Sequence, residues 1–377
     1  MYPKIENRKS RITRVLVLSP PLGSAGGIQR YTLTLARALR DLLGDENVRC
    51  VAIPEARNGH GRFSAGLKLR FGWQALREAA RWKPDLIICT HLALGPIAWL
   101  LAGFGGWPYW IVMHGYEAWA LLPYGKRRAL RQTDRVLVTS AFSREQVVRQ
   151  HRIPSERISS LPCTLDDTLL SVEPARNGSF GLISDRQRVA LTVARMEASE
   201  RYKGHDVVLR ALPSVVAILP DLTYVVMGDG DDRPRLESLA KQLGLSDHVL
   251  FTGQVSDSEL AAFYQRSEVF VLPARTVIDD HNPKGEGFGI VFLEAMAFGK
   301  PVIGPNYGAP AEIIRHGETG LLVDPEDATS VAEGLLNLLT NPDAAHQMGK
   351  AGSKWVREHY SYASFRERLR EILAAGF

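Results

Sequence analysis

The chain has 377 residues, more than one ordinary hydrophobic core holds, so we expect two domains. Hydrophobic residues make up 45% and charged residues 23%, a balance typical of a soluble globular enzyme. Three scattered cysteines, Cys50, Cys89 and Cys163, argue against a disulfide framework and fit a reducing cytoplasm. Cys50 and Cys89 lie in segments expected to be buried strands. Residues 1–14 are polar and charged, so no secretory signal is expected there.

The net charge of +5 conceals an uneven distribution. Residues 1–180 carry 26 Lys and Arg against 14 Asp and Glu, a balance of +12, whereas the remainder carries 20 against 27, a balance of −7. A basic first half indicates an anionic partner for that half. No nucleic-acid recognition motif accompanies the charge, so we expect no nucleic acid and favour an anionic membrane surface.

The first half of the chain alternates predicted strands and helices. Short, almost continuously apolar runs predict strands at 14–19, 48–54, 86–90, 110–114, 135–139 and 158–162. Such runs are typical of a parallel sheet covered on both faces. Helices are expected at 27–43, 72–82 and 143–151, the last with Ser143 as its N-cap. Glycines and prolines interrupt the longest apolar run, 92–113, so we expect a buried helix, a turn and a buried strand there rather than a membrane span.

The second half repeats this alternation after a linker. Residues 163–187 lack periodicity and contain Pro174, Asn177 and Gly178, so we assign them as the linker. Strands are then expected at 189–194, 223–227, 249–252, 269–272 and 301–303, and helices at 206–219, 233–243, 290–298, 328–340, 342–359 and 362–375. Alternation on this scale predicts an α/β fold with a doubly wound sheet in each half.

A glycine-rich loop with two carboxylates enters the helix predicted at 290–298; its sequence over 285–295 is GEGFGIVFLEA. The glycines allow a ligand to approach the backbone closely, and the N–H groups at the helix start attract an anion such as a diphosphate. Glu286 lies in the loop, and Glu294 lies about one turn inside the helix. The apolar neighbours of Glu294 would enclose its charge, which then needs a partner. Together these are the parts needed to hold a nucleotide sugar.

This segment resembles the Glu-x7-Glu motif of the retaining family 4 glycosyltransferases, which have the GT-B fold. Other segments follow in the family's order: Gly26-Gly27 after the first strand, His114-Gly115-Tyr116-Glu117, Arg195, Lys203-Gly204-His205-Asp206, Gly228-Asp229-Gly230, and GETGLLV at 317–323. Any one of these is weak, but their common order is specific. The resemblance implies two Rossmann-like domains facing across a cleft. It implies an acceptor-binding domain at 1–175, a nucleotide-sugar-binding domain at 176–360, and a helix at 361–377 that packs back on the first domain.

The resemblance also implies the site residues. The catalytic set is His114 near the reacting sugar, Arg195 and Lys203 on the diphosphate, and Glu286 on the sugar hydroxyls. The donor-binding set is Gly26, Gly27, Gly228, Gly287, Phe288, Gly289, Ile290, Val291 and Glu294, the last on the ribose hydroxyls. Glu117 is left open between a site role and a surface role. Fixed cations stabilise the leaving charge without a metal, so no metal and no cofactor beyond the nucleotide sugar are expected. The aspartates at 229–232 and 279–280 are expected in turns and loops.

Aromatic and basic residues alternate in one part of the first half. Phe63, Leu67, Leu69, Phe71 and Trp73 are interleaved with Arg62, Lys68 and Arg70, and Lys126, Arg127, Arg128 and Arg131 form a basic run. This pattern suits a segment lying on anionic lipid. An ordinary amphipathic surface with a core-facing stripe is the alternative.

We therefore expect a retaining glycosyltransferase that moves a hexose, with mannose and glucose as candidates, from a nucleotide-diphosphate donor to a glycan or lipid-linked acceptor of envelope polysaccharide or glycolipid synthesis. Phe288 and the segment 114–117 resemble mannosyltransferases that use GDP-mannose; a UDP-hexose stays open. A nucleotide-sugar epimerase or hydrolase on the same fold, and a transferase with a small soluble acceptor, are the alternatives. The expected location is cytoplasmic, with the inner face of the cytoplasmic membrane as the candidate surface.

Overall fold

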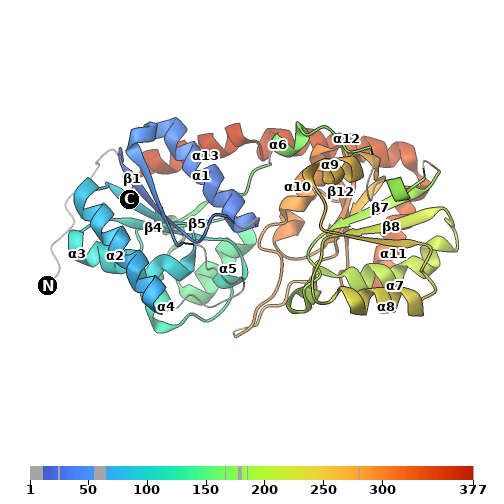
Figure 1. The fold of residues 1–377 in the computed structure, drawn as a ribbon, viewed down its shortest axis with the longest axis horizontal. Coiled ribbons are helices and arrows are strands. Elements are labelled where there is room, and N and C mark those ends of the chain that lie inside the picture. Colours follow the sequence, from blue (N-terminus) through green and yellow to red (C-terminus); the bar gives the residue numbers. More distant parts are fainter. Residues whose placement is uncertain are drawn as a thin grey trace. The chain divides into compact units, whose positions relative to one another are not determined.

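The computed structural model describes residues 12–23, 26–54, 65–165, 167–176, 181–184, 186–279 and 281–376. The chain divides into two compact units, Met1–Thr164 with Tyr362–Phe377, and Leu165–Ser361. Each unit holds a parallel six-stranded sheet with helices packed on it, so the predicted α/β class with a doubly wound sheet in each half is confirmed (Figure 1).

The sheet of the first unit has the strand order β2-β1-β3-β4-β5-β6. Its strands are β1 (Val15–Ser19), β2 (Val48–Ala52), β3 (Leu86–Cys89), β4 (Tyr109–Met113), β5 (Arg135–Val138) and β6 (Ile158–Ser160). Its helices are α1 (Gly27–Leu43), α2 (Ala65–Trp82), α3 (Gly95–Gly105), α4 (Tyr124–Gln132), α5 (Ala141–His151) and α13 (Tyr362–Ala375). Strands β1, β3 and β4 are buried along their whole length, as continuous apolar runs predict.

The last helix of the chain, α13, belongs to the first unit and lies beside α1 (Figure 1). The hydroxyl of Tyr362 donates to Asp41 Oδ2 at 2.5 Å, and the guanidinium of Arg37 lies 4.2 Å from the centre of the Tyr362 ring. Phe365 is buried with its ring edge-on to Tyr31 at 5.7 Å. The chain therefore returns from the second unit to complete the core of the first.

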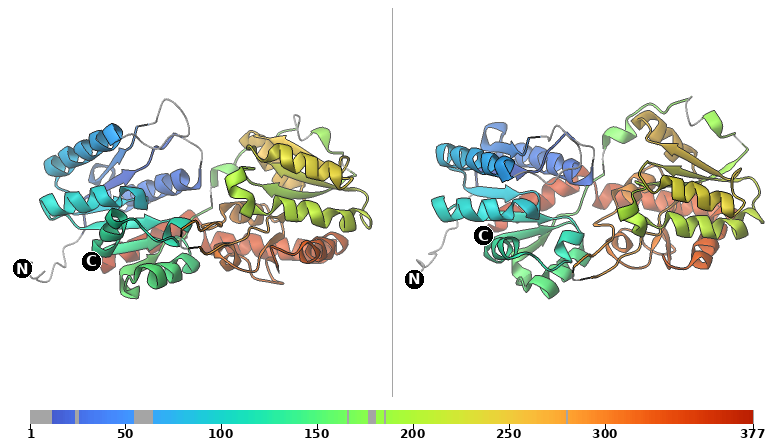
Figure 2. Two further views of the ribbon diagram at one scale, coloured as in Figure 1. Left: turned by 90° about the horizontal axis from the view of Figure 1, so that it is seen from below. Right: turned by 60° about the horizontal axis from the view of Figure 1, so that its bottom comes forward.

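The sheet of the second unit has the order β12-β11-β10-β7-β8-β9. Its strands are β7 (Arg188–Val193), β8 (Leu222–Met227), β9 (Val249–Gly253), β10 (Val269–Val271), β11 (Val302–Pro305) and β12 (Gly320–Val323). Its helices are α6 (Asp167–Leu170), α7 (His205–Val216), α8 (Arg233–Gln242), α9 (Asp257–Arg266), α10 (Ile290–Ala297), α11 (Ala328–Thr340) and α12 (Pro342–His359). Helices α7 and α8 lie side by side (Figure 2), and α7 packs with α11 over a core that includes Val208, Leu212 and Leu335.

The two strand orders determine where a ligand can enter. In the first sheet the order reverses between β1 and β3, and in the second it reverses between β7 and β10. Open parallel sheets leave a crevice beyond the carboxyl ends of the strands at such a reversal. The loops after these four strands are therefore the positions at which site residues should gather.

Several sequence-based details need correction. Ser143 is not the N-cap of α5; Ser140 is, and its side chain accepts from the Ser143 amide at 3.1 Å. Helix α2 begins at Ala65 rather than 72. Strand β12 and helix α9 were not predicted. Cys50 is exposed because β2 is an edge strand.

The domain boundary also lies elsewhere than the assigned 175/176. Residues 165–175 lie within the second unit. The Leu165 amide donates to the Tyr360 carbonyl at 2.8 Å, and the Ala175 amide donates to the Ser258 carbonyl at 2.9 Å. These backbone bonds attach the linker to the second unit.

The packing of α12 gives a test of the fold. A Cβ at Gly349 would lie 2.0 Å from the carbonyl oxygen of Gly299, at the turn that follows α10. We expect Gly349→Ala to destabilise the protein by about 1–3 kcal/mol, because the helix must move away from this backbone. Gly72→Ala in α2 is the control: its Cβ would meet open space, so it should stabilise by about 0.5–1 kcal/mol. Thermal unfolding of both variants checks this. Unchanged stability of Gly349→Ala would show that the backbone at Gly299 has room for the added Cβ.

Candidate active site

Cations and carboxylates alternate at the strand-order reversal of the second unit. Arg195 follows β7, and Lys203 ends the 3-10 helix η6 (Ala198–Lys203). The Lys203 Nζ lies 2.9 Å from Glu286 Oε1 and 3.6 Å from Glu200 Oε2. Glu200 Oε1 in turn accepts from Arg195 Nη2. The structure therefore brings together three predicted catalytic residues, Arg195, Lys203 and Glu286, and adds Glu200, which sequence reasoning missed.

The loop that carries Lys203 is held by the chain after β10. Gly204 has φ +80°. A Cβ at this position would lie 2.3 Å from the Pro273 carbonyl oxygen, so only glycine allows this approach. The Arg275 amide donates to the Tyr202 carbonyl at 2.6 Å. These contacts join the loops after β7 and β10, the two strands between which the order reverses.

Burial and charge act against each other at Lys203. Its side chain is only 12% exposed, and that of Glu286 is 18% exposed. Burial by itself lowers the pKa of Lys203, but the charges of Glu286 and Glu200 raise it, and the net pKa lies above the ordinary value. Lys203 therefore stays a cation in a site with little water. The side chain of Arg195 is 68% exposed, so its guanidinium is open to an entering ligand.

Helix α10 begins at Ile290, directly after the glycine-rich loop that carries Glu286, as the sequence predicted. Gly289 caps α10 with φ +102°, a left-handed conformation, and no acidic residue lies in the first turn. Ile290 and Val291 are half-buried, whereas the rest of α10 is buried. The Phe288 ring is buried edge-on to Tyr360 at 5.8 Å, so this side chain serves packing.

Glu294 is enclosed, and its partner is Tyr264. Glu294 is 2% exposed, and Oε2 accepts from the Tyr264 hydroxyl at 3.0 Å. The sequence predicted that this charge needs a partner; the partner lies on α9, a helix that the sequence did not predict. Gly228 lies at the end of β8, and its amide donates to the Gly253 carbonyl at 3.0 Å.

The aspartates at 229–232 and Asp279 have protein partners. Asp231 Oδ1 accepts from the Ala198 amide at 2.6 Å, which helps to hold η6, and Asp232 pairs with Arg201 and Arg235. Asp279 accepts from the backbone of two following residues; Asp280 lies outside the described residues. Within the described ranges no group of three or more His, Cys, Asp or Glu is arranged to hold a metal ion.

Two neighbouring histidines follow β3 and β4 in the first unit. His114 Nε2 donates to the Thr90 carbonyl at 2.7 Å, and the ring of Tyr31 from α1 stands edge-on to it at 4.9 Å. His91, which sequence reasoning missed, stacks with His114 at 6.3 Å, and its Nδ1 accepts from the Ala93 amide. Burial lowers the pKa of both rings, against the opposing charge of Glu117, so both are neutral at pH 7. The signal that could have found His91 is its position directly after β3, at the reversal of strand order.

Gly26, Gly27 and Glu117 also lie near the carboxyl ends of the first sheet. Gly26 is the N-cap of α1 with φ −169°, an extended conformation that any residue adopts, and Gly27 opens the helix. The first turn of α1 has no acidic residue, so its N-terminus is electropositive. Glu117 accepts from the backbone amide of His114, which fixes the turn after β4.

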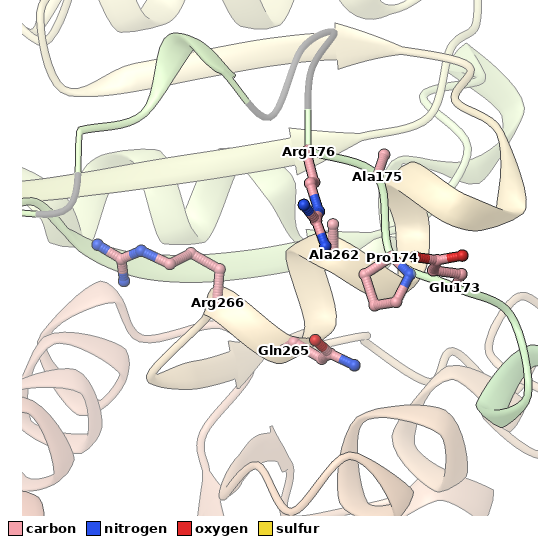
Figure 3. A pocket seen from close by; sticks show the side chains of 7 residues that line it. All are labelled: Glu173, Pro174, Ala175, Arg176, Ala262, Gln265 and Arg266. Carbon is pink, nitrogen blue, oxygen red and sulfur yellow. The ribbon is translucent and has the colours of Figure 1, made fainter.

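A pocket elsewhere in the second unit contains none of the predicted site residues. It has a volume of about 520 Å³ and lies where residues 173–176 pass α9 (Figure 3). Its lining residues are Glu173, Pro174, Ala175, Arg176, Ala262, Gln265 and Arg266. None of the cations and carboxylates gathered after β7 and β10 lines this pocket.

Comparison with known proteins agrees with this geometry. The family described as Glycosyl transferases group 1 matches residues 179–355, and that described as Glycosyltransferase Family 4 matches residues 25–169. A GDP-mannose-dependent alpha-(1-6)-phosphatidylinositol monomannoside mannosyltransferase of Mycobacterium tuberculosis is 34% identical over 69% of this chain and 68% of the relative. A D-inositol 3-phosphate glycosyltransferase of Thermobispora bispora is 27% identical over 97% of this chain and 95% of the relative.

Solved structures share the fold. A glycosyltransferase from Rickettsia africae has a TM-score of 0.78 at 17% identity, over 96% of this chain and 98% of that chain. Sucrose-phosphate synthase from Thermosynechococcus elongatus has a TM-score of 0.77 at 22% identity, over 96% of this chain and 100% of that chain. The fold is therefore that of the GT-B glycosyltransferases. The chain belongs to the family 4 glycosyltransferases, and it is a hexosyltransferase that uses a nucleotide sugar.

The exposed Arg195 allows a clean test of the site. We expect Arg195→Ala to lower turnover about 10²–10³-fold, the usual loss when one electrostatic stabiliser of a leaving group is removed, with little change in stability. Arg188→Ala is the control, because Arg188 lies at the opposite end of β7 in a surface pair with Asp221 at 2.7 Å. Turnover is measured at saturating donor. Equal turnover of the two variants would remove Arg195 from the site.

Proposed function

We propose that this enzyme transfers mannose from GDP-mannose, with retention at the anomeric carbon, to a lipid-linked acceptor that carries inositol phosphate. The observation that carries the proposal is the cluster of Arg195, Lys203 and Glu286 beside the start of α10. It combines two cations for a diphosphate with a carboxylate for sugar hydroxyls. The names of the relatives supply the finer assignment, because they specify GDP-mannose or an inositol phosphate acceptor.

The proposed roles divide between the units. In the second unit, Arg195 and Lys203 bind the diphosphate, Glu286 binds the sugar hydroxyls, and Glu294 binds the ribose hydroxyls. The backbone of residues 287–291 lies against the sugar and phosphates, and Gly228 borders the donor. In the first unit, His114 accepts a hydrogen bond from a hydroxyl group through Nδ1, because its Nε2 donates to Thr90, and the N-terminus of α1 at Gly26 and Gly27 binds a phosphate.

The proposed reaction is a single displacement on one face of the sugar. The bond between the anomeric carbon and the diphosphate oxygen breaks as the acceptor oxygen forms a new bond to that carbon. The acceptor proton passes to the departing phosphate oxygen. Arg195, Lys203 and the N-terminus of α10 stabilise the negative charge that develops on this oxygen, so the proposal needs neither a metal nor a further cofactor.

A binding and product assay in excess EDTA tests the donor and acceptor together. GDP and GDP-mannose should raise the unfolding temperature more than UDP and UDP-glucose; at 100 times its Kd a ligand adds about 2.7 kcal/mol of stability. Mannose should then appear on phosphatidylinositol mannoside and not on D-inositol 3-phosphate. Preference for UDP would contradict the donor assignment. Transfer to the soluble acceptor alone would contradict the lipid, and release of free mannose alone would indicate a hydrolase.

We further propose that the first unit docks on the inner face of the cytoplasmic membrane. None of the helices in the described part of the chain has the length and apolar character to cross a bilayer. Large exposed apolar side chains lie on α2 and α3, which are in contact: Leu69, Trp73, Leu100 and Phe104. Phe71 is buried in the core, as are Ala75 and Ala79, so the alternative reading of α2 as an amphipathic helix with a core-facing stripe is correct for that face. Phe63 and Arg62 lie outside the described residues.

Co-sedimentation with liposomes tests the membrane surface. Binding to phosphatidylglycerol vesicles should exceed binding to neutral vesicles and weaken as salt rises, because each basic residue near an anionic surface adds about 1 kcal/mol. Replacing Lys68, Arg70, Arg127 and Arg128 by Ser should lower binding strongly. A matched control replaces Arg210, Lys241, Lys350 and Lys354, four exposed basic residues of the second unit. An equal effect of both sets, or equal binding to both kinds of vesicle, would remove this surface.

A further inference from the structure

Glu200 is a carboxylate that touches both cations of the site. Its Oε1 accepts from Arg195, and its Oε2 lies 3.6 Å from Lys203 Nζ. The side chain is 15% exposed, and Oε2 is buried without a hydrogen-bond partner. Within the described part of the chain, these two cations are its only ion-pair partners. Glu200 is therefore built into the site rather than placed on the surface.

The local backbone holds Glu200 in this position. It lies at a kink in η6, with φ −113° and ψ 24°, where the regular helix is interrupted. Its amide donates to the Glu197 carbonyl at 2.8 Å. Two residues earlier, the Ala198 amide is held by Asp231. The kink occurs between Arg195 and Lys203 in sequence, so a single short loop places the carboxylate between both cations.

The charges of the cluster balance. Arg195 and Lys203 carry two positive charges, and Glu200 and Glu286 carry two negative charges. Glu286 has a role on the sugar hydroxyls in the proposed function, whereas Glu200 lies among the groups that face the diphosphate. A carboxylate at this place aims the two cations, but its charge opposes every negative charge that the ligand brings.

Donor and product differ in the charge that they bring. The diphosphate of a nucleotide sugar is esterified at both ends and carries two negative charges. The product ends in a free phosphate, which ionises once more with a pKa of about 6, so at pH 8 it carries a third. Resting on the proposed function, we infer that Glu200 is a positioning residue that makes the site hold the product diphosphate less tightly than its extra charge would otherwise allow. The product nucleotide is thereby released more readily, while the nucleotide-sugar donor stays bound.

The test measures a ratio of affinities rather than activity alone. Glu200→Gln keeps the size of the side chain and an acceptor oxygen for Arg195 but removes the charge. Calorimetry gives the Kd of GDP and of GDP-mannose at pH 8 and at pH 5.5, and the same pair of measurements is made with UDP and UDP-glucose. We expect the variant to bind both ligands of a pair more tightly, and the product by about a further tenfold at pH 8. At pH 5.5, where the terminal phosphate is mostly protonated, this further factor should largely disappear. In steady state, KM for the donor and kcat should both fall as release slows.

Three other variants keep the inference falsifiable. Glu200→Ala should shift the ratio in the same direction even where its absolute affinities are lower, and Glu200→Asp, which retains the charge, should keep the wild-type ratio. Glu237→Gln removes a carboxylate from a surface pair with Arg233 in the same unit and should change nothing. An unchanged ratio in Glu200→Gln and Glu200→Ala, or an equal weakening of both ligands, would overturn the role of Glu200. Failure of the wild-type enzyme to bind either nucleotide would instead overturn the proposed nucleotide site.

Discussion

The ion pair between Lys203 and Glu286 is the interaction on which the site of the second unit depends. It joins the loop after β7 to the loop before α10, and both side chains are mostly buried. A buried charge is stable only with a partner, so each residue holds the other in place, and the charge of Glu286 raises the pKa of Lys203. The close approach of Gly204 to Pro273 aligns the two loops so that this pair can form.

The topology explains why these loops meet. Strands β7 and β10 are neighbours, although β8 and β9 lie between them in the chain, because the strand order reverses there. The first unit has the same kind of reversal between β1 and β3. His91 follows β3 at this reversal, and it stacks with His114, which follows the neighbouring strand β4. The two units place different chemical groups at this reversal of strand order. The second gathers permanent charges, which suit a diphosphate, and the first gathers neutral imidazoles, which can orient hydroxyls.

The basic residues of the two halves differ in whether they are paired with carboxylates. In the second unit most arginines of the site region are paired with carboxylates: Arg201 and Arg235 with Asp232, Arg275 with Asp206, and Arg195 with Glu200. This pairing fits the net negative balance of that half. In the first unit the basic residues of α2 and α4 lie mostly at the surface, among exposed apolar side chains such as Trp73. The positive charge of α2 and α4 therefore lies mostly at the surface of the first unit.

The sequence by itself determined the class of fold, the positions of most strands and helices, and the family. Apolar runs and helical periodicity are local signals, and α1, α11, α12 and α13 have the predicted bounds. The family follows from motifs whose order is visible in one dimension. Strand β12 (Gly320–Val323) was not predicted, and Cys50 was misplaced because local pattern does not show that β2 is an edge strand. Only the tertiary structure decided the partners: Tyr264 for Glu294, Glu200 for Arg195 and Lys203, and His91 for His114. Pairing energies depend on distance and burial, and these are fixed by strand order and by loop contacts between residues far apart in the chain.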